Sequence, residues 1–226
     1  MKREFTYAQS VRRSLVKTYR KSIWNAFVEA CKNYRLVSDG DRILLFLEND
    51  GASILLSLLF EQLKRVSETD FEYSVAAHNA QLSRFEIEAK NVAGFDEAVS
   101  YAKENGYNRL AVTTNLNDVV NTVITGLFRG SQIMGILPKE AGDGLEIIRP
   151  LFCIYERDIE KWMSFNSIEL EANLNKDDEA ARLVEEIKKV NPYVEHNAFT
   201  AIHNVKLDTI NGYYLNGEAH SFLEKY

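Results

Sequence analysis

Cysteine is scarce in this chain. Only Cys31 and Cys153 occur, far apart in the sequence, and no two cysteines are separated by two residues. A disulfide framework and a cysteine-built metal site are therefore not expected, and a reducing cytoplasm is the natural location. Histidine is also rare. His196 and His203 have no cysteine or carboxylate beside them at metal-ligand spacing, so no zinc or other metal site is expected.

Long hydrophobic runs are also missing. The longest ones, residues 43–47 and 54–60, are too short to span a bilayer. The first residues, MKREFTYAQSVRRS, are charged but lack the apolar core of a signal peptide. The composition, 46% hydrophobic and 27% charged, is that of an ordinary globular protein, so we expect no membrane contact.

Positive charge is concentrated at the N-terminus. Residues 1–22 contain seven basic residues and one acidic residue, although the whole chain has a net charge of −6. Two interpretations are open. The basic residues Arg12, Arg13, Arg20 and Lys21 could contact the phosphate backbone of an RNA, or they could form a solvated helix face. The charge pattern by itself favours the solvated face.

Strands and helices alternate along the chain. Strand-like runs at Arg42–Leu47, 71–77 and 110–113 are followed by helical patterns at 52–66, 96–105 and 118–128. This alternation predicts an α/β protein with a Rossmann-like, mostly parallel sheet and helices on both faces. We expect a basic N-terminal helix packed on the core (1–40), an α/β domain (41–165) and a mostly helical C-terminal extension (166–226). A short strand is expected at 85–89.

Polar residues follow two of the predicted strands. In open α/β sheets ligands bind beyond the carboxyl ends of the strands, where helix N-termini present free N–H groups. The candidate nucleotide-binding residues are Glu48, Asn49, Asp50, Gly51, Ser53, Thr114, Asn115 and Asp118. The alternative for both segments is structural, because such residues commonly form turns and cap helices.

A family resemblance rests on three segments in order: RILLFL-ENDGAS-ILLSLL, then NRLAVTTNLNDVVNTVITGLFRGSQIMGILPK, then IIRPLFCIYERDI. Together they resemble the PP-loop ATP pyrophosphatases (adenine nucleotide alpha-hydrolase-like proteins), most closely the tRNA 2-thiocytidine synthetase type. The likeness covers roughly residues 10–165. It implies ATP or AMP with Mg²⁺ as ligands and a tRNA as the substrate of an active member.

The functional positions depart from the family pattern. Where the family has Ser-Gly-Gly-Lys-Asp-Ser, this chain has Glu48 to Ser53 and keeps only the last serine. Where the family has Gly-His-His-x-Asp-Asp, only Asp118 is kept. The Cys-x-x-Cys of the thiolating branch is absent, so no iron–sulfur cluster is expected. The loss of the lysine and the two glycines, together with the carboxylates Glu48 and Asp50 in the same loop, reverses the charge that a triphosphate needs.

Three hypotheses follow. The first is a divergent PP-loop protein with lost or altered ATP chemistry that binds a nucleotide-like ligand or a partner at the old pocket. The second is an active adenylating enzyme that acts on tRNA and releases AMP and pyrophosphate. The third is a non-catalytic RNA-binding or assembly protein that uses the basic N-terminal helix. Whether the chain is an enzyme stays open, as do the identity of a tRNA or protein partner and a homo-oligomeric state.

Overall fold

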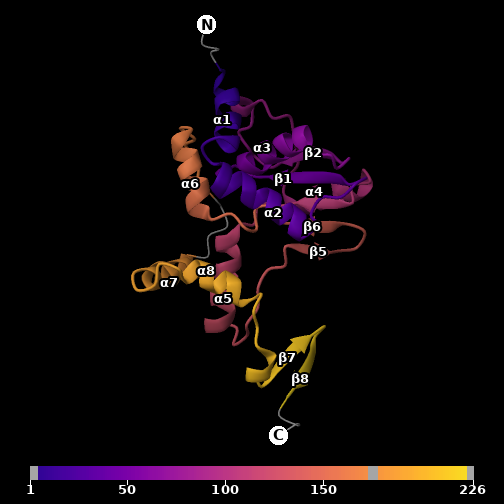
Figure 1. The fold of residues 1–226 in the computed structure, drawn as a ribbon. Helices are drawn as coiled ribbons and strands as arrows, with labels where there is room; N and C mark the ends of the chain where they lie inside the picture. Colours follow the sequence, from indigo (N-terminus) through magenta and orange to yellow (C-terminus); the bar gives the residue numbers. More distant parts are fainter. Residues whose placement is uncertain (1–4, 173–177, 223–226) are drawn as a thin grey trace.

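The protein is described by a computed structural model, which covers residues 5–172 and 178–222 of the 226-residue chain. Helices and strands alternate through its first two thirds (Figure 1). The helices are α1 (Tyr7–Val16), a π-helical turn η1 (Arg20–Trp24), α2 (Asn25–Asn33), α3 (Gly51–Val66), the 3₁₀ turn η2 (Ser83–Phe85), α4 (Phe95–Glu104), α5 (Leu116–Phe128), α6 (Glu156–Phe165), α7 (Asp178–Lys188), α8 (Val194–Ala201) and the 3₁₀ turn η3 (Leu207–Thr209).

Six strands form the main sheet in the order β3-β2-β1-β4-β6-β5. They are β1 (Arg42–Leu47), β2 (Glu72–Ala77), β3 (Lys90–Asn91), β4 (Arg109–Ala111), β5 (Lys139–Ala141) and β6 (Glu146–Ile148). All neighbours are parallel except the edge strand β5, which runs antiparallel to β6. The predicted α/β class with a Rossmann-like, mostly parallel sheet is confirmed.

The central strand β1 is buried on both faces. Ile43, Leu45 and Leu47 belong to a large cluster with residues of α1, η1, α2, α3 and α6. Leu44 and Phe46 point to the opposite face, where they pack with residues of α4. Because side chains alternate along a strand, a run such as RILLFL is apolar throughout when helices cover both faces.

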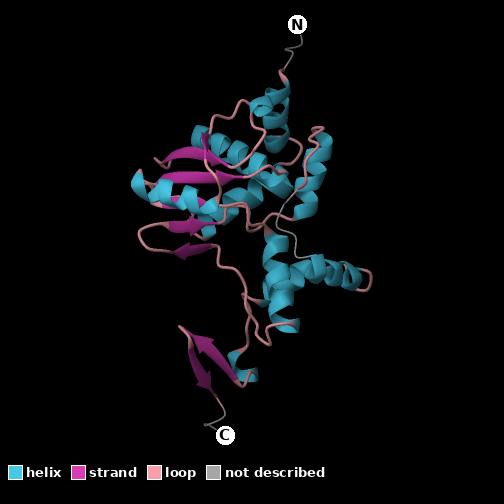
Figure 2. Ribbon diagram, turned by 180° about the vertical axis from the view of Figure 1, so that it is seen from behind, coloured by secondary structure: helices cyan, strands magenta, loops and turns pink. Residues whose placement is uncertain are grey.

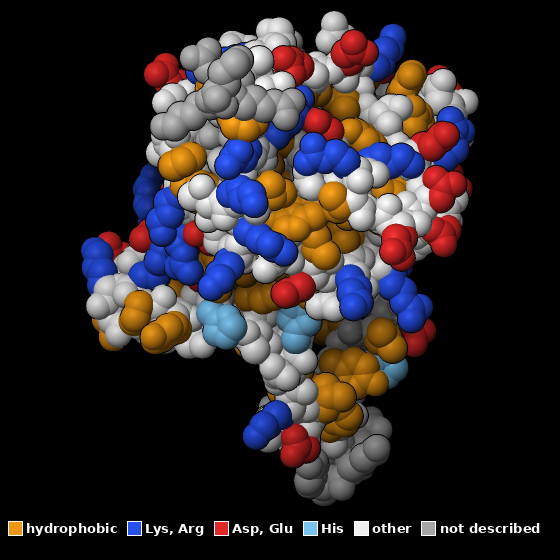
Figure 3. All heavy atoms as spheres, turned by 45° about the horizontal axis from the view of Figure 1, so that its top comes forward, with side chains coloured by type: hydrophobic (Ala, Val, Ile, Leu, Met, Phe, Trp, Pro, Cys, Tyr) orange, Lys and Arg blue, Asp and Glu red, His pale blue; other side chains and the backbone are white. Residues whose placement is uncertain are grey.

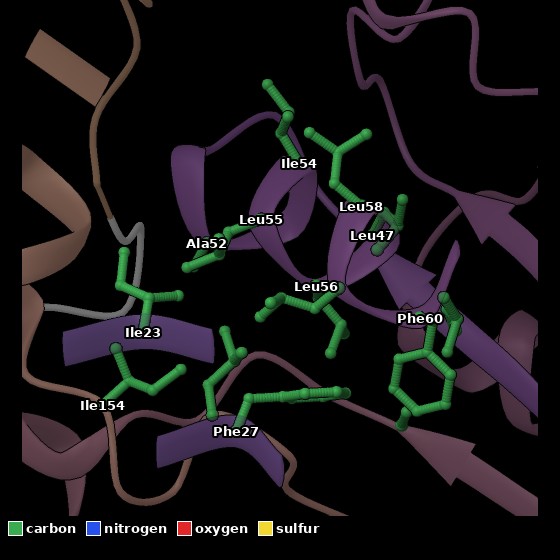
Figure 4. Packing of buried hydrophobic residues seen from close by; sticks show 14 of the residues in the cluster. Ile23, Phe27, Leu47, Ala52, Ile54, Leu55, Leu56, Leu58, Phe60 and Ile154 are labelled. Atoms are coloured by element: carbon green, nitrogen blue, oxygen red, sulfur yellow. The ribbon is translucent and has the colours of Figure 1, made fainter. Parts of the chain in front are cut away.

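The large cluster lies between the N-terminal helices and α3. Figure 4 shows Phe27, Leu56 and Phe60 directed toward one another, with Ile23 and Ile154 beside them. The rings of Phe27 and Phe60 meet edge to face, with their centroids 5.7 Å apart. Such contacts between fully buried aromatic and aliphatic side chains supply most of the apolar burial that stabilises the domain.

The N-terminal segment differs from the single predicted helix. The helix is interrupted at η1, where the N–H groups of Tyr19 and Trp24 bond to carbonyls five residues earlier. This wider turn inserts an extra residue while Leu15 and Ile23 both stay buried. The break lets α1 and α2 follow the curved surface of the core with separate axes.

One further prediction needs correction, and one needs an addition. The strand expected at 85–89 is wrong, because those residues form η2 and a loop in which Glu86 has a left-handed backbone (φ 58°). The C-terminal extension is helical in α7 and α8, as expected, but it also forms a hairpin of β7 (Gly212–Leu215) and β8 (Glu218–Ser221). The Asn-Gly pairs at 211–212 and 216–217 are residues that favour such turns, and the second pair forms the hairpin turn.

The C-terminal helices pack on α5 away from the main sheet (Figure 2). Leu116, Val120 and Ile124 of α5 form a third apolar cluster with residues of α7 and α8. None of the helices in the described part of the chain has the length and apolar character needed to cross a membrane.

Candidate functional site

The loop after β1 is held by its own side chains. Asp50 caps α3, since its Oδ1 accepts a hydrogen bond from the Ser53 amide at 2.7 Å. Ser53 Oγ in turn accepts the amide of Glu48 at 2.8 Å. Both Asp50 and Ser53 are fully buried. The structure therefore gives these two candidate residues a bracing role within the loop.

The first amides of α3 are occupied by the chain itself. The Gly51 amide donates to the carbonyl oxygen of Glu171 at 2.8 Å, and the Ala52 amide donates to that of Ala172 at 3.0 Å. These N–H groups form the part of a helix N-terminus that normally binds an anion. Two backbone oxygens from a segment 120 residues later in the sequence take that position here.

Met163, a residue of α6, fills the space beside the first amides of α3. A Cβ atom built on Gly51 would lie 2.1 Å from Met163 Sδ, so no side chain fits at position 51 unless Met163 moves. Met163 is itself buried. Position 51 is the one that aligns with the lysine of the family pattern. The structure thus fills the space beside this amide cluster with a packed side chain.

The second candidate loop caps α5. Asn115 Oδ1 accepts the amides of Asn117 and Asp118, and Asp118 Oδ2 accepts the Asn115 amide at 2.8 Å. This is a capping box. Asn117 connects three helices, since its Oδ1 accepts the Glu156 amide and its Nδ2 donates to Glu195.

A pocket of about 360 Å³ opens at the carboxyl edge of the sheet, between the ends of β1, β4 and β6. The strand order reverses beside β1, and this is where open α/β sheets bind ligands. The candidate residues Glu48 and Thr114 both line the pocket. Its other lining residues are Phe46, Phe95, Val112, Thr113, Ile147 and Arg149.

The remaining candidates are distributed around this pocket. Asp118 lines a neighbouring cavity of about 310 Å³, and Thr114 lines both. Asn49 Oδ1 accepts the Gln81 amide and so holds the loop after β2. The sequence interpretation did not select Arg149 or Phe95. The Ile-Arg-Pro-Leu motif follows a strand, so the sequence could have indicated Arg149 as a pocket residue. No pattern in the sequence indicated Phe95.

Arg149 is largely buried and fixed at the pocket wall. Its Nη1 donates to the Leu137 carbonyl at 2.8 Å, and its Nη2 contacts Glu140 at 3.1 Å. Phe46 and Phe95 meet edge to face at 5.6 Å and give the pocket an apolar side. A guanidinium, threonine hydroxyls and two rings form a suitable lining for a small planar ligand with polar substituents.

Glu48 carries an unfavourable charge in this pocket. Burial raises the pKa of its carboxyl group above the ordinary value, the nearby Asp50 carboxylate raises it further, and His78 acts in the opposite direction. The folded state therefore holds the Glu48 proton more tightly than the unfolded chain does. Stability is lost as the pH rises through the raised pKa.

We expect Glu48→Gln to remove this pH dependence. The melting temperatures of variant and parent should agree at low pH, where Glu48 is neutral. The variant should become the more stable of the two as the pH rises from about 4 to about 7. Thermal unfolding across that range measures the difference. Glu104→Gln, at an exposed position of α4, controls for loss of one negative charge. A parent that gains stability over the variant with rising pH would contradict the expectation.

The four candidate RNA-binding residues have different environments. Arg12 joins α1 to α3 and η2, because its Nε lies 2.8 Å from Glu61 and its Nη2 donates to the Phe85 carbonyl. Arg13, Arg20 and Lys21 are exposed. Figure 3 shows Lys and Arg side chains gathered over one face of the molecule. Arg12 is therefore structurally engaged, whereas the other three are exposed, with Arg13 lying over the Phe5 ring at 4.9 Å.

Comparisons with known proteins identify the fold and its relatives. No family model matches the chain. A tRNA(Ile)-lysidine synthase of Persephonella marina is 26% identical over 88% of this chain and 52% of its own length. A tRNA-cytidine(32) 2-sulfurtransferase of Coxiella burnetii is 22% identical over 84% of this chain and 92% of its own length. The chain thus spans about half the length of the lysidine synthase.

A solved structure shares the fold. The U34-tRNA thiolase of Methanococcus maripaludis, described with its [4Fe–4S] cluster, superposes with a TM-score of 0.60. It is 13% identical and is matched over 84% of this chain and 80% of its own. At that identity the likeness concerns the fold. The expectation that this chain has no iron–sulfur cluster is contradicted by this structural neighbour, which is described with one.

The cysteines of this chain do not supply a ligand set for such a cluster. Cys31 is buried, and burial raises the pKa of its thiol to about 12, so it is held as a neutral thiol. Among the residues that the structure describes, no three His, Cys, Asp or Glu side chains are grouped as metal ligands. Cluster iron is held by cysteine thiolates, so we derive no chemistry through a cluster here. The curated relatives, both named as tRNA-modifying enzymes, and the shared fold confirm the resemblance to the PP-loop superfamily that the sequence shows.

Proposed function

We propose that this chain is a divergent PP-loop protein that has lost the ATP pyrophosphatase reaction and binds a nucleotide-like ligand at the carboxyl edge of its sheet. The closure of the α3 N-terminus carries the proposal. The amides of Gly51 and Ala52 are bonded to the carbonyls of Glu171 and Ala172, and Met163 packs over Gly51.

The energetic consequence of that closure is large. Pyrophosphate release needs N–H donors or cations on the transferred phosphates, and each such donor is worth about 3 kcal/mol in comparable sites. Here two donors are already bonded, and the carboxylates of Glu48 and Asp50 stand nearby. A triphosphate would have to displace the 171–172 segment and then face two negative charges.

The neighbouring pocket supports ligand binding without that reaction. Its volume of about 360 Å³ is within the range of small-molecule sites. Phe95 can stack on a planar base, and Arg149 and Thr114 offer polar contacts at its rim. A nucleoside or nucleoside monophosphate fits this combination better than a triphosphate does.

We expect the purified chain to release neither AMP nor pyrophosphate from ATP. The assay contains Mg²⁺ and total tRNA, and both products are followed by chromatography against a no-protein blank. Release of both in proportion to protein would support the alternative, an active adenylating enzyme. In that case the double variant Asp50→Asn, Asp118→Asn should abolish the release, because this alternative assigns the binding of Mg²⁺ to these two carboxylates.

We expect AMP to bind the pocket and ATP to bind no better. Calorimetric titration should give an affinity that Phe95→Ala weakens by about tenfold, the loss expected for one stacking contact of about 1–3 kcal/mol. Phe165→Ala, which removes an exposed ring on α6, is the matched control and should leave AMP affinity unchanged. Absence of heat with either nucleotide, confirmed by an independent binding assay, would remove the ligand part of the proposal.

A second candidate function, binding of tRNA without catalysis, is favoured by the exposed basic residues of α1 and η1. These elements adjoin α6, since Tyr19 Oη donates to the Lys161 carbonyl at 2.8 Å. Met163 of α6 covers Gly51, so this face borders the carboxyl edge of the sheet. A tRNA held there would lie beside the pocket.

A further inference from the structure

The outer edge of β2 is covered over only part of its length. β2 pairs with β1 through all six of its residues, whereas β3 pairs only with the last two. The amide of Glu72 donates to a carbonyl just before β1, and the carbonyl of Ala77 accepts the Val92 amide on the side of β3. Because alternate residues of a strand direct their N–H and C=O groups to opposite sides, those of Tyr73 and Val75 point to the outer edge. In the described chain no strand lies beside Tyr73 on that side.

A large cavity adjoins this uncovered edge. Its volume is about 650 Å³, and it is lined by residues 73–75 of β2 and by residues 86–90, which lead into β3. The remaining lining residues come from α1, α3, α4 and the turn after α4: Arg12, Ser57, Glu61, Tyr101 and Tyr107. Residues 86–89 and the edge of β2 thus border the same space without forming a ladder.

The residues before β3 alternate as in a strand. Ile87 and Ala89 are apolar, whereas Glu86 and Glu88 are charged. In the structure these four residues form a turn and a loop, and Ile87 is only partly buried where it packs against the large apolar cluster. The strand pattern in this segment therefore has no strand partner.

The register of β3 fixes where a longer β3 would lie. β3 begins opposite Ala76, and continuing the ladder toward the start of β2 places Ala89 opposite Val75. Two residues earlier, Ile87 comes to lie opposite Tyr73. Val75 belongs to the large apolar cluster and Tyr73 packs against it, so both apolar side chains of the segment would reach the face of the sheet that this cluster covers. The alternation of the segment and the register of β3 thus agree, although each comes from a different observation.

The loop is defined by contacts of Arg12 and by the backbone of Glu86. The Nη2 of Arg12 donates to the Phe85 carbonyl at 2.9 Å, and its Nη1 lies 3.4 Å from the Glu86 carboxylate. Glu86 has a left-handed backbone, with φ 58°, which strains a residue other than glycine and lies outside the strand region. An extended Glu86 would lose this strain but would stand opposite Glu72, so the like charges should end the ladder at Ile87.

We propose that residues 87–89 exchange between this loop and an extension of β3 that pairs with the outer edge of β2. In the extended state the Glu88 amide donates to the Tyr73 carbonyl, the Val75 amide donates to the Glu88 carbonyl, and the cavity closes. The loop keeps the contacts with Arg12, whereas the extension gains ladder hydrogen bonds and covers a strand edge at which sheets otherwise pair with other chains. This exchange is independent of the nucleotide pocket at the carboxyl edge of the sheet.

Two substitutions at Glu86 should shift the exchange in opposite directions. Glu86→Gly favours the loop, because glycine adopts positive φ without strain, whereas Glu86→Val disfavours it, because a β-branched residue does not. Both remove the same carboxylate, so each controls for the loss of charge in the other. Amide hydrogen exchange with water, measured by NMR, reports the state, since the amides of Glu88 and Val75 gain these acceptors only in the extension. We expect both amides to exchange about tenfold more slowly in Glu86→Val than in Glu86→Gly, while the amide of Leu45 in β1 shows whether each variant keeps its global stability.

Disulfide trapping tests the register independently. In the extension Glu88 lies opposite Ser74, and the spacing of neighbouring strands is within the distance between Cα atoms that a disulfide spans. Both residues are exposed, so Ser74→Cys with Glu88→Cys should preserve the fold. In a glutathione buffer this pair should form its disulfide at least about tenfold faster than the shifted pair, Ser74→Cys with Glu86→Cys. Peptide mass mapping separates both from products of Cys31 and Cys153.

Two outcomes would overturn the proposal. Equal exchange rates of the Glu88 and Val75 amides in the two Glu86 variants would mean that the segment stays a loop whatever its backbone preference. Equal trapping of the in-register and shifted pairs would mean that the segment approaches β2 without a fixed register. Slower exchange in Glu86→Val, together with preferential trapping of the in-register pair, would support the extension of β3.

Discussion

Glu195→Ala is expected to lower the free energy of unfolding by about 2–4 kcal/mol. Glu195 is a buried carboxylate of α8 that accepts hydrogen bonds from Asn117 of α5 at 2.7 Å, Lys188 at 3.1 Å and Arg157 of α6 at 3.2 Å. Alanine removes all three bonds and leaves the partly buried side-chain amide of Asn117 without this acceptor. Because Lys188 and Arg157 still reach water, the loss should be smaller than for a wholly buried pair.

Urea denaturation measures the total loss of unfolding free energy, and hydrogen exchange shows which helices and strands lose protection. We expect the amides of α7 and α8 to exchange faster while those of β1 keep their protection, since Glu195 joins the C-terminal helices to α5 and α6. Glu185→Ala is the matched control. It removes an exposed carboxylate that also pairs with Lys188, and should cost no more than about 0.5 kcal/mol. If Glu195→Ala cost as little, the apolar cluster alone would hold these helices in place.

Neutralising the exposed basic residues of α1, of η1 and of the turn between them should strongly weaken tRNA binding. The variant replaces the four exposed residues Arg13, Lys17, Arg20 and Lys21 by glutamine. Each phosphate contact contributes about 0.9 or less to the slope of log affinity against log salt concentration, so we expect the slope to fall by about 3. Affinity at low salt should fall by at least about tenfold. Filter binding or fluorescence anisotropy at several salt concentrations measures both quantities.

A matched variant controls for the change in net charge. It replaces four exposed basic residues outside α1 and η1 by glutamine: Arg65, Lys90, Lys103 and Lys206. This variant should keep most of the affinity and the slope of the parent. Equal losses in both variants would mean that the protein attracts RNA by its overall charge. Salt-independent binding, or none, would contradict the second candidate function. Arg12 is left unchanged in both variants because its ion pair with Glu61 stabilises the fold.

Much of the fold could be predicted because it follows from local patterns. The run RILLFL predicts a strand covered on both faces, and β1 has helices packed on each side. Capping was the structural alternative for the second polar segment, and Asn115 does cap the helix after β4. Such signals depend on neighbours within a few residues, which is why single-sequence reasoning can use them. The π-helical turn at Arg20–Trp24 left no such signal, because the hydrophobic spacing across it is still close to that of an α-helix.

The sequence by itself determined the α/β alternation, the position of the two loops at the carboxyl edge, and the departure of those loops from the family pattern. The tertiary structure decided what the loops do. Residues 171–172 reach the amides of Gly51 and Ala52. Arg12 is held by Glu61, and Asn117 is held by Glu195. These contacts join segments that are 49 to 120 residues apart, so no local pattern specifies them. They depend on how the helices pack around the sheet, and packing is fixed only when the whole chain is folded.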